Sequence, residues 1–180
     1  MIEPDDTAPE PMPKAFSVGY NSTSGEALVY GGATLIFIGA IVTLLQREPA
    51  GLLLALAGLG SSVYFRPLIE ARRPQIAANM QGLYVDRIGV ISWTAIASID
   101  VRETNLRTMH FSRLVVRLAV PLERAVVVPD EGPWWRRLTV KNWKRKDDRL
   151  EIKLDTLKAD PMVVIRRVKA FHRVATFSPS

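Results

Sequence analysis

Residues 28–65, LVYGGATLIFIGAIVTLLQREPAGLLLALAGLGSSVYF, decide the fold of this chain. They hold two uncharged apolar runs, Leu28–Leu45 and Ala50–Phe65, separated by four residues. A helix needs about 20 mainly apolar residues to cross the hydrocarbon core of a bilayer, with a range of about 17–25. The first run is long enough, and the second becomes so if it extends through Ile69 with Arg66 reaching the interface. We therefore predict a two-helix transmembrane hairpin, with helices over 28–45 and 50–69.

The alternative is a pair of buried helices in a soluble core. A soluble helix normally keeps a polar face, and neither run has one, so the membrane interpretation is favoured. Lipid cannot hydrogen-bond to the backbone, so each span should be helical throughout. The N-terminus is acidic, which argues against a secretory signal peptide.

The short connection between the runs predicts that both tails lie on one side of the bilayer. Near the helix ends, the tail side carries Lys14, Arg66, Arg72 and Arg73, whereas the connection carries Arg47. Lys and Arg accumulate on the cytoplasmic side. We therefore expect a multi-pass protein of the cell membrane with cytoplasmic N- and C-termini.

Small residues recur inside the second run. They are candidate helix-packing residues: Gly51, Ala55, Gly58 and Ser62. Each pair is four residues apart and lies on one helical face, which lets helix backbones approach closely. Packing within the hairpin and packing against a partner helix both fit this pattern.

Charge divides the chain into three regions. Residues 1–27 have a net charge of −4, are rich in Pro, Asp and Ser, and are expected to be a disordered acidic tail. Residues 28–69 form the hairpin, and 70–177 are expected to form a cytoplasmic domain, within a stretch (66–180) of net charge +10. The chain has no cysteine, so disulfides and thiolate metal sites are excluded.

Short alternating runs divided by turn residues follow Pro74 and predict antiparallel strands. The expected strands are 75–78, 83–86, 89–93, 96–101, 113–120, 125–128, 138–141 and 150–154. The last element should be an amphipathic helix over 161–175, capped by Asp160, with Val164, Val168 and Phe171 on its apolar face. The expected fold is a membrane α-hairpin plus a cytoplasmic antiparallel β-barrel or sandwich of about six or seven strands, capped by a C-terminal α-helix.

This order of elements resembles the bacterial PH-like (pleckstrin-homology-like) membrane proteins. The matching residues are the Gly82-Leu83 step and the pattern Ile91, Trp93, Ile96 and Ile99. The resemblance implies a PH-like fold and a bacterial inner-membrane location. Trp93 itself is expected to pack in the core or at the rim of the barrel. PH domains that bind phosphoinositides do so with basic residues around the loop that joins the first two strands. The corresponding loop here, residues 79–82, is short and uncharged, so no phosphoinositide pocket is expected.

We find no catalytic or metal-binding pattern and expect a non-enzymatic protein without a cofactor. The acid pairs Asp130-Glu131 and Asp147-Asp148 are expected to be solvated turns, and His172 is expected to be a solvated helix residue.

The unusual surface stretch combines tryptophan with basic residues. Its candidate lipid- or partner-binding residues are Trp134, Trp135, Arg136, Arg137, Trp143, Lys144, Arg145 and Lys146. At a membrane interface, Trp occupies the head-group zone while Lys and Arg attract anionic lipid. A protein-partner surface, ordinary packing of the tryptophans and single-stranded nucleic acid are alternatives, and a domain next to a bilayer argues against nucleic acid.

Two functions fit the sequence. The first is a membrane-anchored PH-like binding or scaffold protein that holds a protein partner, a second copy of itself or the anionic membrane surface. The second is a small accessory subunit of a larger membrane complex, with the hairpin packing against other transmembrane helices.

Overall fold

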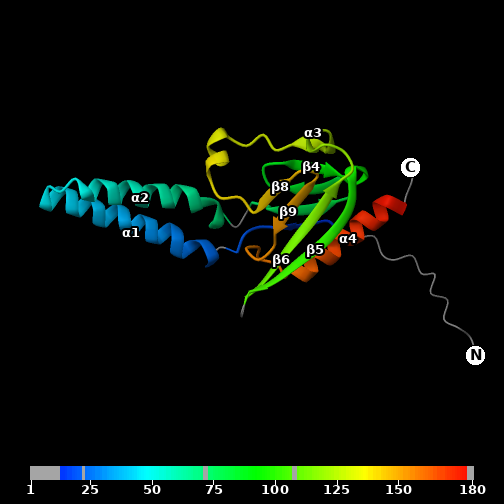
Figure 1. Cartoon of the computed structure of the whole chain (residues 1–180), viewed down its shortest axis with the longest axis horizontal. Coiled ribbons are helices and arrows are strands. Elements are labelled where there is room, and N and C mark those ends of the chain that lie inside the picture. The colour runs from blue at the N-terminus through cyan, green and yellow to red at the C-terminus, as the bar shows by residue number, and fades with distance from the viewer. Residues whose placement is uncertain (1–12, 22, 71–72, 107–108, 178–180) are drawn as a thin grey trace, which may run out of the picture.

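The computed structural model describes residues 13–21, 23–70, 73–106 and 109–177, and shows a helical hairpin joined to a two-sheet domain (Figure 1). The helices are α1 (Thr23–Gln46), α2 (Ala50–Phe65), α3 (Leu122–Ala125) and α4 (Pro161–Phe177). The strands are β1 (Phe16–Val18), β2 (Ile76–Asn79), β3 (Gly82–Val85), β4 (Gly89–Ser92), β5 (Ile96–Leu106), β6 (Met109–Leu118), β7 (Val126–Pro129), β8 (Trp143–Lys146) and β9 (Arg149–Lys153). Short 3₁₀ helices are η1 (Arg66–Leu68), η2 (Trp93–Ala95) and η3 (Trp134–Leu138).

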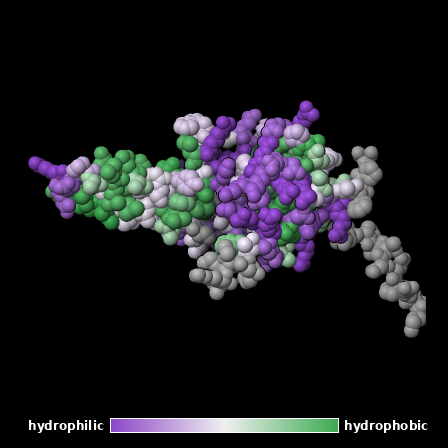
Figure 2. Space-filling view, in the orientation of Figure 1, coloured by the Kyte–Doolittle hydropathy of each residue, from purple (hydrophilic) through white to green (hydrophobic). Residues whose placement is uncertain are grey.

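The hairpin of α1 and α2 extends away from the domain and exposes apolar side chains along its length (Figures 1 and 2). Both helices are long and apolar enough to cross a membrane. In the most apolar 18-residue segment of each, only 11% of the residues of α1 and 22% of those of α2 are buried. Leu44 and Leu45 are both 78% exposed. The helices are therefore not core helices of the two-sheet domain.

The candidate packing residues of α2 lie against α1. A Cβ on Gly58 would lie 2.5 Å from the carbonyl oxygen of Gly32, and a Cβ on Gly51 would lie 2.6 Å from that of Gly39. Both helices thus place glycines seven residues apart at the crossing points, a spacing that keeps one seam facing the partner helix. The Ser62 hydroxyl donates to the Val29 carbonyl oxygen across the seam (3.2 Å). These small residues are used within the hairpin.

The domain is a sandwich of two antiparallel sheets, one of five strands in the order β1-β2-β3-β4-β7 and one of four in the order β5-β6-β9-β8. Their inner faces form one apolar core. Helix α4 covers an end of this core, where Phe171 stacks on Trp93 with 6.1 Å between ring centroids. Val164 and Val168 of the predicted apolar face are also buried, and so is Trp93, as predicted.

Three expectations differ from the structure. The predicted disordered tail contains strand β1, which pairs with β2, and α1 begins at Thr23; residues 1–12 lie outside the described part of the chain. The predicted strand 138–141 is absent, because the Val140 amide donates to the Tyr64 carbonyl oxygen rather than to a sheet. The edge strand is β8 instead. His172 is half-buried and donates to the Ile96 carbonyl oxygen at 3.1 Å.

Candidate membrane-facing site

The loop 130–140 lies beside the domain end of α2 (Figure 1). The Val140 amide donates to the Tyr64 carbonyl oxygen at 3.0 Å. The Arg66 guanidinium lies 5.8 Å from the centroid of the Trp135 ring, a cation–π contact between η1 and the loop. These contacts place the loop at the end of the domain from which the hairpin extends.

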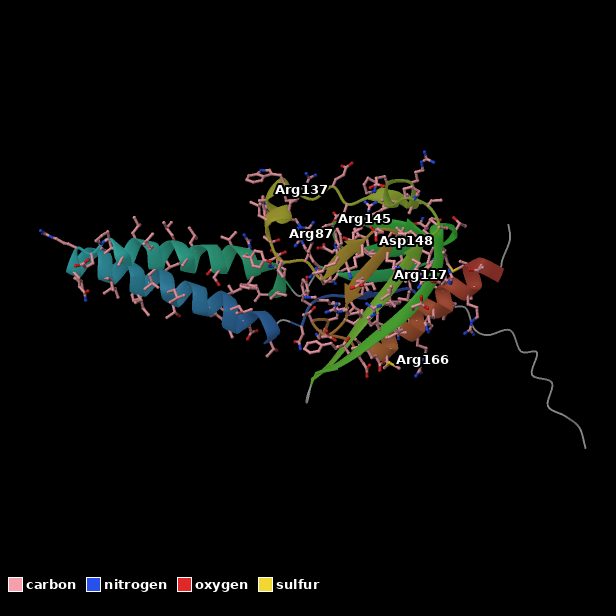
Figure 3. The ribbon with its side chains drawn as sticks, in the orientation of Figure 1. Arg87, Arg117, Arg137, Arg145, Asp148 and Arg166 are labelled. Carbon is pink, nitrogen blue, oxygen red and sulfur yellow. The ribbon has the colours of Figure 1, made fainter. Side chains whose placement is uncertain are left out.

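The loop presents an exposed apolar and basic tip, formed by helix η3 after Pro133. Trp134 is 73% exposed and Leu138 is 66% exposed. Arg137 is also exposed and extends from the loop near α2 (Figure 3). We refer to Trp134, Arg137 and Leu138 as the Trp134–Leu138 tip. Exposed apolar side chains that gather at one place, with a basic residue beside them, can mark a site of contact with a membrane or with a second protein.

A buried cluster of two carboxylates and two guanidinium groups holds the loop in place. Arg136 donates to Asp86 at 2.5 Å, and it lies 3.4 Å from Asp130. The Arg87 backbone amide donates to Asp130 at 2.8 Å, and the Arg87 side chain donates to the Thr139 carbonyl oxygen at 2.9 Å. The turn between β3 and β4 is thereby tied to both ends of the loop, since 130 and 139 flank the tip.

Burial governs the electrostatics of this cluster. Loss of solvent raises the pKa of Asp86, and nearby Asp130 adds to that effect, while Arg136 and Arg87 oppose it. Burial, together with Asp130 and Asp86, raises the pKa of Tyr84 to about 12. Two positive groups face two negative ones, so the cluster is neutral as a unit, and we assign it a positioning role.

The predicted tryptophan and basic stretch is divided by the structure. Arg136 is buried in the cluster, contrary to the expectation that it faces lipid. Trp143 is half-buried, and its indole donates to the Asp86 carbonyl oxygen at 2.8 Å. Arg145 pairs with Glu123 at 2.6 Å. Lys144 and Lys146 lie on β8, and Trp135 is half-buried beside Arg66. Of the predicted residues, Trp134 and Arg137 are exposed on the loop beside α2, together with the neighbouring Leu138.

Sequence reasoning missed Asp86, Arg87 and Asp130. Asp130 was expected to be solvated, but its side chain is only 16% exposed and has three hydrogen-bond donors around it. Charged residues next to turns are usually solvated. No local pattern distinguishes these from the solvated turn Asp147-Asp148, where both residues are exposed.

A cavity of about 330 Å³ opens beside the cluster. It is lined by Arg73, Pro74, Tyr84, Asp86, Asp130, Glu131, Gly132, Pro133 and Arg136. Within the described ranges, no group of three or more His, Asp or Glu side chains is arranged to hold a metal ion. Comparison of the chain with protein-family models, with curated proteins and with solved structures gives no match.

Proposed function

We propose that this chain is a non-enzymatic, membrane-anchored binding module, in which α1 and α2 span the bilayer and the Trp134–Leu138 tip contacts the membrane surface. The observation that carries the proposal is the tip's position beside the domain end of two exposed apolar helices. In the bacterial PH-like proteins that the chain resembles, a hairpin and a small β domain occur in the same order.

The exposed apolar surface of the hairpin supports a membrane-spanning role. Leu53 is 71% exposed and Phe37 is 69% exposed. Burying such side chains is favourable by about 25 cal/mol per Å² of apolar surface, and lipid supplies that burial along the whole hairpin. Inside the hairpin, Thr43 donates to the Gly39 carbonyl oxygen at 2.9 Å, so a polar side chain in the span has a partner.

The pairing of β1 with β2 supports the proposal that the segments before α1 and after α2 lie on the same side of the membrane. Residues 16–18 precede α1 and residues 76–78 follow α2, yet they share one sheet. A spanning hairpin would therefore have the two flanking segments in the same compartment. The excess of Lys and Arg outside the connection favours the cytoplasm, which would place the protein in the bacterial inner membrane.

The composition of the tip favours lipid as its partner. Tryptophan prefers the interfacial zone of a bilayer, and a basic residue near an anionic leaflet gains about 1 kcal/mol. Arg137 supplies such a charge, and Arg66 supplies a second one beside Trp135, the residue that follows Trp134 in the loop. Because the ion cluster fixes the loop, the tip needs little ordering when it meets the interface.

The test uses the full-length protein in nanodiscs that contain brominated phospholipid, which quenches tryptophan at the bilayer. Trp134→Phe should remove a quenched component of the fluorescence. Trp143→Phe is the matched control, because Trp143 packs on the core, and the quenched component should remain. Equal quenching in wild type and Trp134→Phe would place the tip away from the lipid.

An accessory-subunit role is the second candidate, supported by the exposed outer faces of α1 and α2. Gly31 and Gly60 face open space on the hairpin, where another helix could approach. Purification in mild detergent separates the candidates. A stoichiometric larger complex favours the subunit, whereas a lone protein or oligomer favours the binding module.

A further inference from the structure

The outer face of the four-stranded sheet carries two rows of basic residues that cross the strands. The first row is Arg102, Arg113 and Lys153, and the second is Arg117, Arg149 and Lys146. Within each row the residues are direct cross-strand partners. Lys144 lies between the rows, opposite Glu151. We refer to these seven residues as the basic sheet face.

The rows cost stability in the isolated protein. Like charges directly opposite each other on a sheet are destabilising. Three carboxylates offset them in part. Glu151 lies 3.7 Å from Arg102 and 3.4 Å from Arg113, Asp100 lies 3.7 Å from Arg117, and Asp148 lies 3.6 Å from Arg149. Seven basic groups against three acidic groups leave a positive surface that an external anion would stabilise.

The spacing of the rows is regular. Arg113 and Arg117 are four residues apart on β6, so the rows are separated by about 13–14 Å along the strands. Neighbours within a row are separated by about 5 Å, the distance between strands. Arg102 is 57% exposed and Arg117 is 47% exposed, so their charged groups reach solvent. Figure 2 shows this part of the domain as a broad hydrophilic surface turned toward the viewer.

The orientation of the face argues against the bilayer as its partner, a step that rests on the proposed function. The hairpin extends sideways in Figure 1, while β5, β6, β8 and β9 lie across the front of the domain. If the hairpin crosses the membrane, the basic sheet face stands roughly perpendicular to the plane of the bilayer and does not face the lipid surface. A partner of this face would then lie beside the domain, close to the membrane surface.

We propose that the basic sheet face binds an acidic surface of a second protein that lies next to the membrane. Charge complementarity carries this choice, because rows of carboxylates would neutralise the two rows. Single-stranded nucleic acid is disfavoured, since such sites stack bases on aromatic side chains. Among the described residues of β5, β6, β8 and β9, Phe111 is half-buried and Trp143 packs on the core. An anionic leaflet would also repel nucleic acid.

The experiment measures binding of a fluorescent glutamate homopolymer peptide to the full-length protein in zwitterionic nanodiscs. The triple variant Lys144→Gln, Lys146→Gln and Lys153→Gln removes two exposed charges and one half-buried charge. It should weaken binding about tenfold, as expected for the loss of three charge contacts at a surface. The matched control is Arg124→Gln, Arg166→Gln and Lys169→Gln, which changes net charge equally on exposed positions elsewhere. Its affinity should stay within about twofold of the wild type.

Three results would overturn the assignment. These are absence of peptide binding by the wild type, equal weakening in the control, and displacement of the peptide by an oligonucleotide at lower concentration than by unlabelled peptide. The double variant Trp134→Ser and Leu138→Ser should keep its affinity for the peptide while losing lipid quenching. A failure at the basic sheet face is therefore distinguishable from a failure of the proposed lipid contact.

Discussion

Asp86 and Arg136 form the buried pair on which the shape of the loop 130–140 depends. Asp86→Asn should destabilise the domain by about 1–3 kcal/mol, because the amide oxygen is a weaker acceptor than the carboxylate for the buried guanidinium of Arg136, which keeps Asp130 as its remaining charged partner. The control Asp148→Asn removes a carboxylate that is 62% exposed and should cost less than about 1 kcal/mol. Denaturant unfolding in detergent measures both. Equal small effects would show that the cluster does not hold the loop.

Tyr84 gives this region a dependence on alkaline pH. Its pKa is about 12 in the folded protein, against 10.0 ordinarily, so folding keeps the phenol protonated. The raised pKa contributes stability below pH 10, and that contribution is lost as the pH rises from 10 to 12. Tyr84→Phe should remove a phenolate absorbance step near pH 12 and flatten the fall in stability. An unchanged step would assign it to another tyrosine.

At the scale of the element, close packing of α1 against α2 holds the hairpin together. Gly58→Leu should disrupt the contact of α1 with α2, because a Cβ there would lie 2.5 Å from the Gly32 carbonyl oxygen and 2.7 Å from the Ile36 amide nitrogen. Backbone atoms cannot move away without separating the helices. The same substitution at Gly60, where a Cβ meets nothing within 4 Å, should be tolerated. Thermal unfolding in detergent compares the variants, and equal loss would contradict this packing.

Helix α4 stabilises the sandwich through its apolar face. Phe171 is 1% exposed and stacks on Trp93, so Phe171→Ala should cost about 3–5 kcal/mol. Lys169→Ala, at an exposed position on the same helix, should change stability by no more than about 0.5 kcal/mol. Denaturant unfolding of the full-length protein measures both. Comparable losses would mean that the helix packs through a different face.

At the scale of the whole molecule, we expect the connection between α1 and α2 to lie outside the cell and the β domain to lie in the cytoplasm. The chain has no cysteine, so single cysteines report position without background. Glu48→Cys, in the connection between the helices, should react with an impermeant reagent applied to intact cells. Thr94→Cys, exposed on the domain, should react only after lysis. The reverse pattern would place the domain outside the cell.

The amino-acid sequence by itself determined the elements whose signal is local. Unbroken apolar runs predicted the two long helices, period-2 alternation predicted most strands, and Val164, Val168 and Phe171 at helical spacing predicted α4 and its buried face. These features need no knowledge of distant residues, because side-chain direction follows from the backbone period alone.

Only the tertiary structure decided the features that depend on residues far apart in the chain. The strand Phe16–Val18 became part of a sheet through its pairing with β2, across the whole hairpin. Arg136 left the predicted surface patch because Asp86, fifty residues away, offered a buried partner. The basic rows exist only through strand register, which brings Arg102, Arg113 and Lys153 into one line. Strand register and side-chain burial are set by packing between segments. The sequence of one segment does not by itself determine which other segment it packs against.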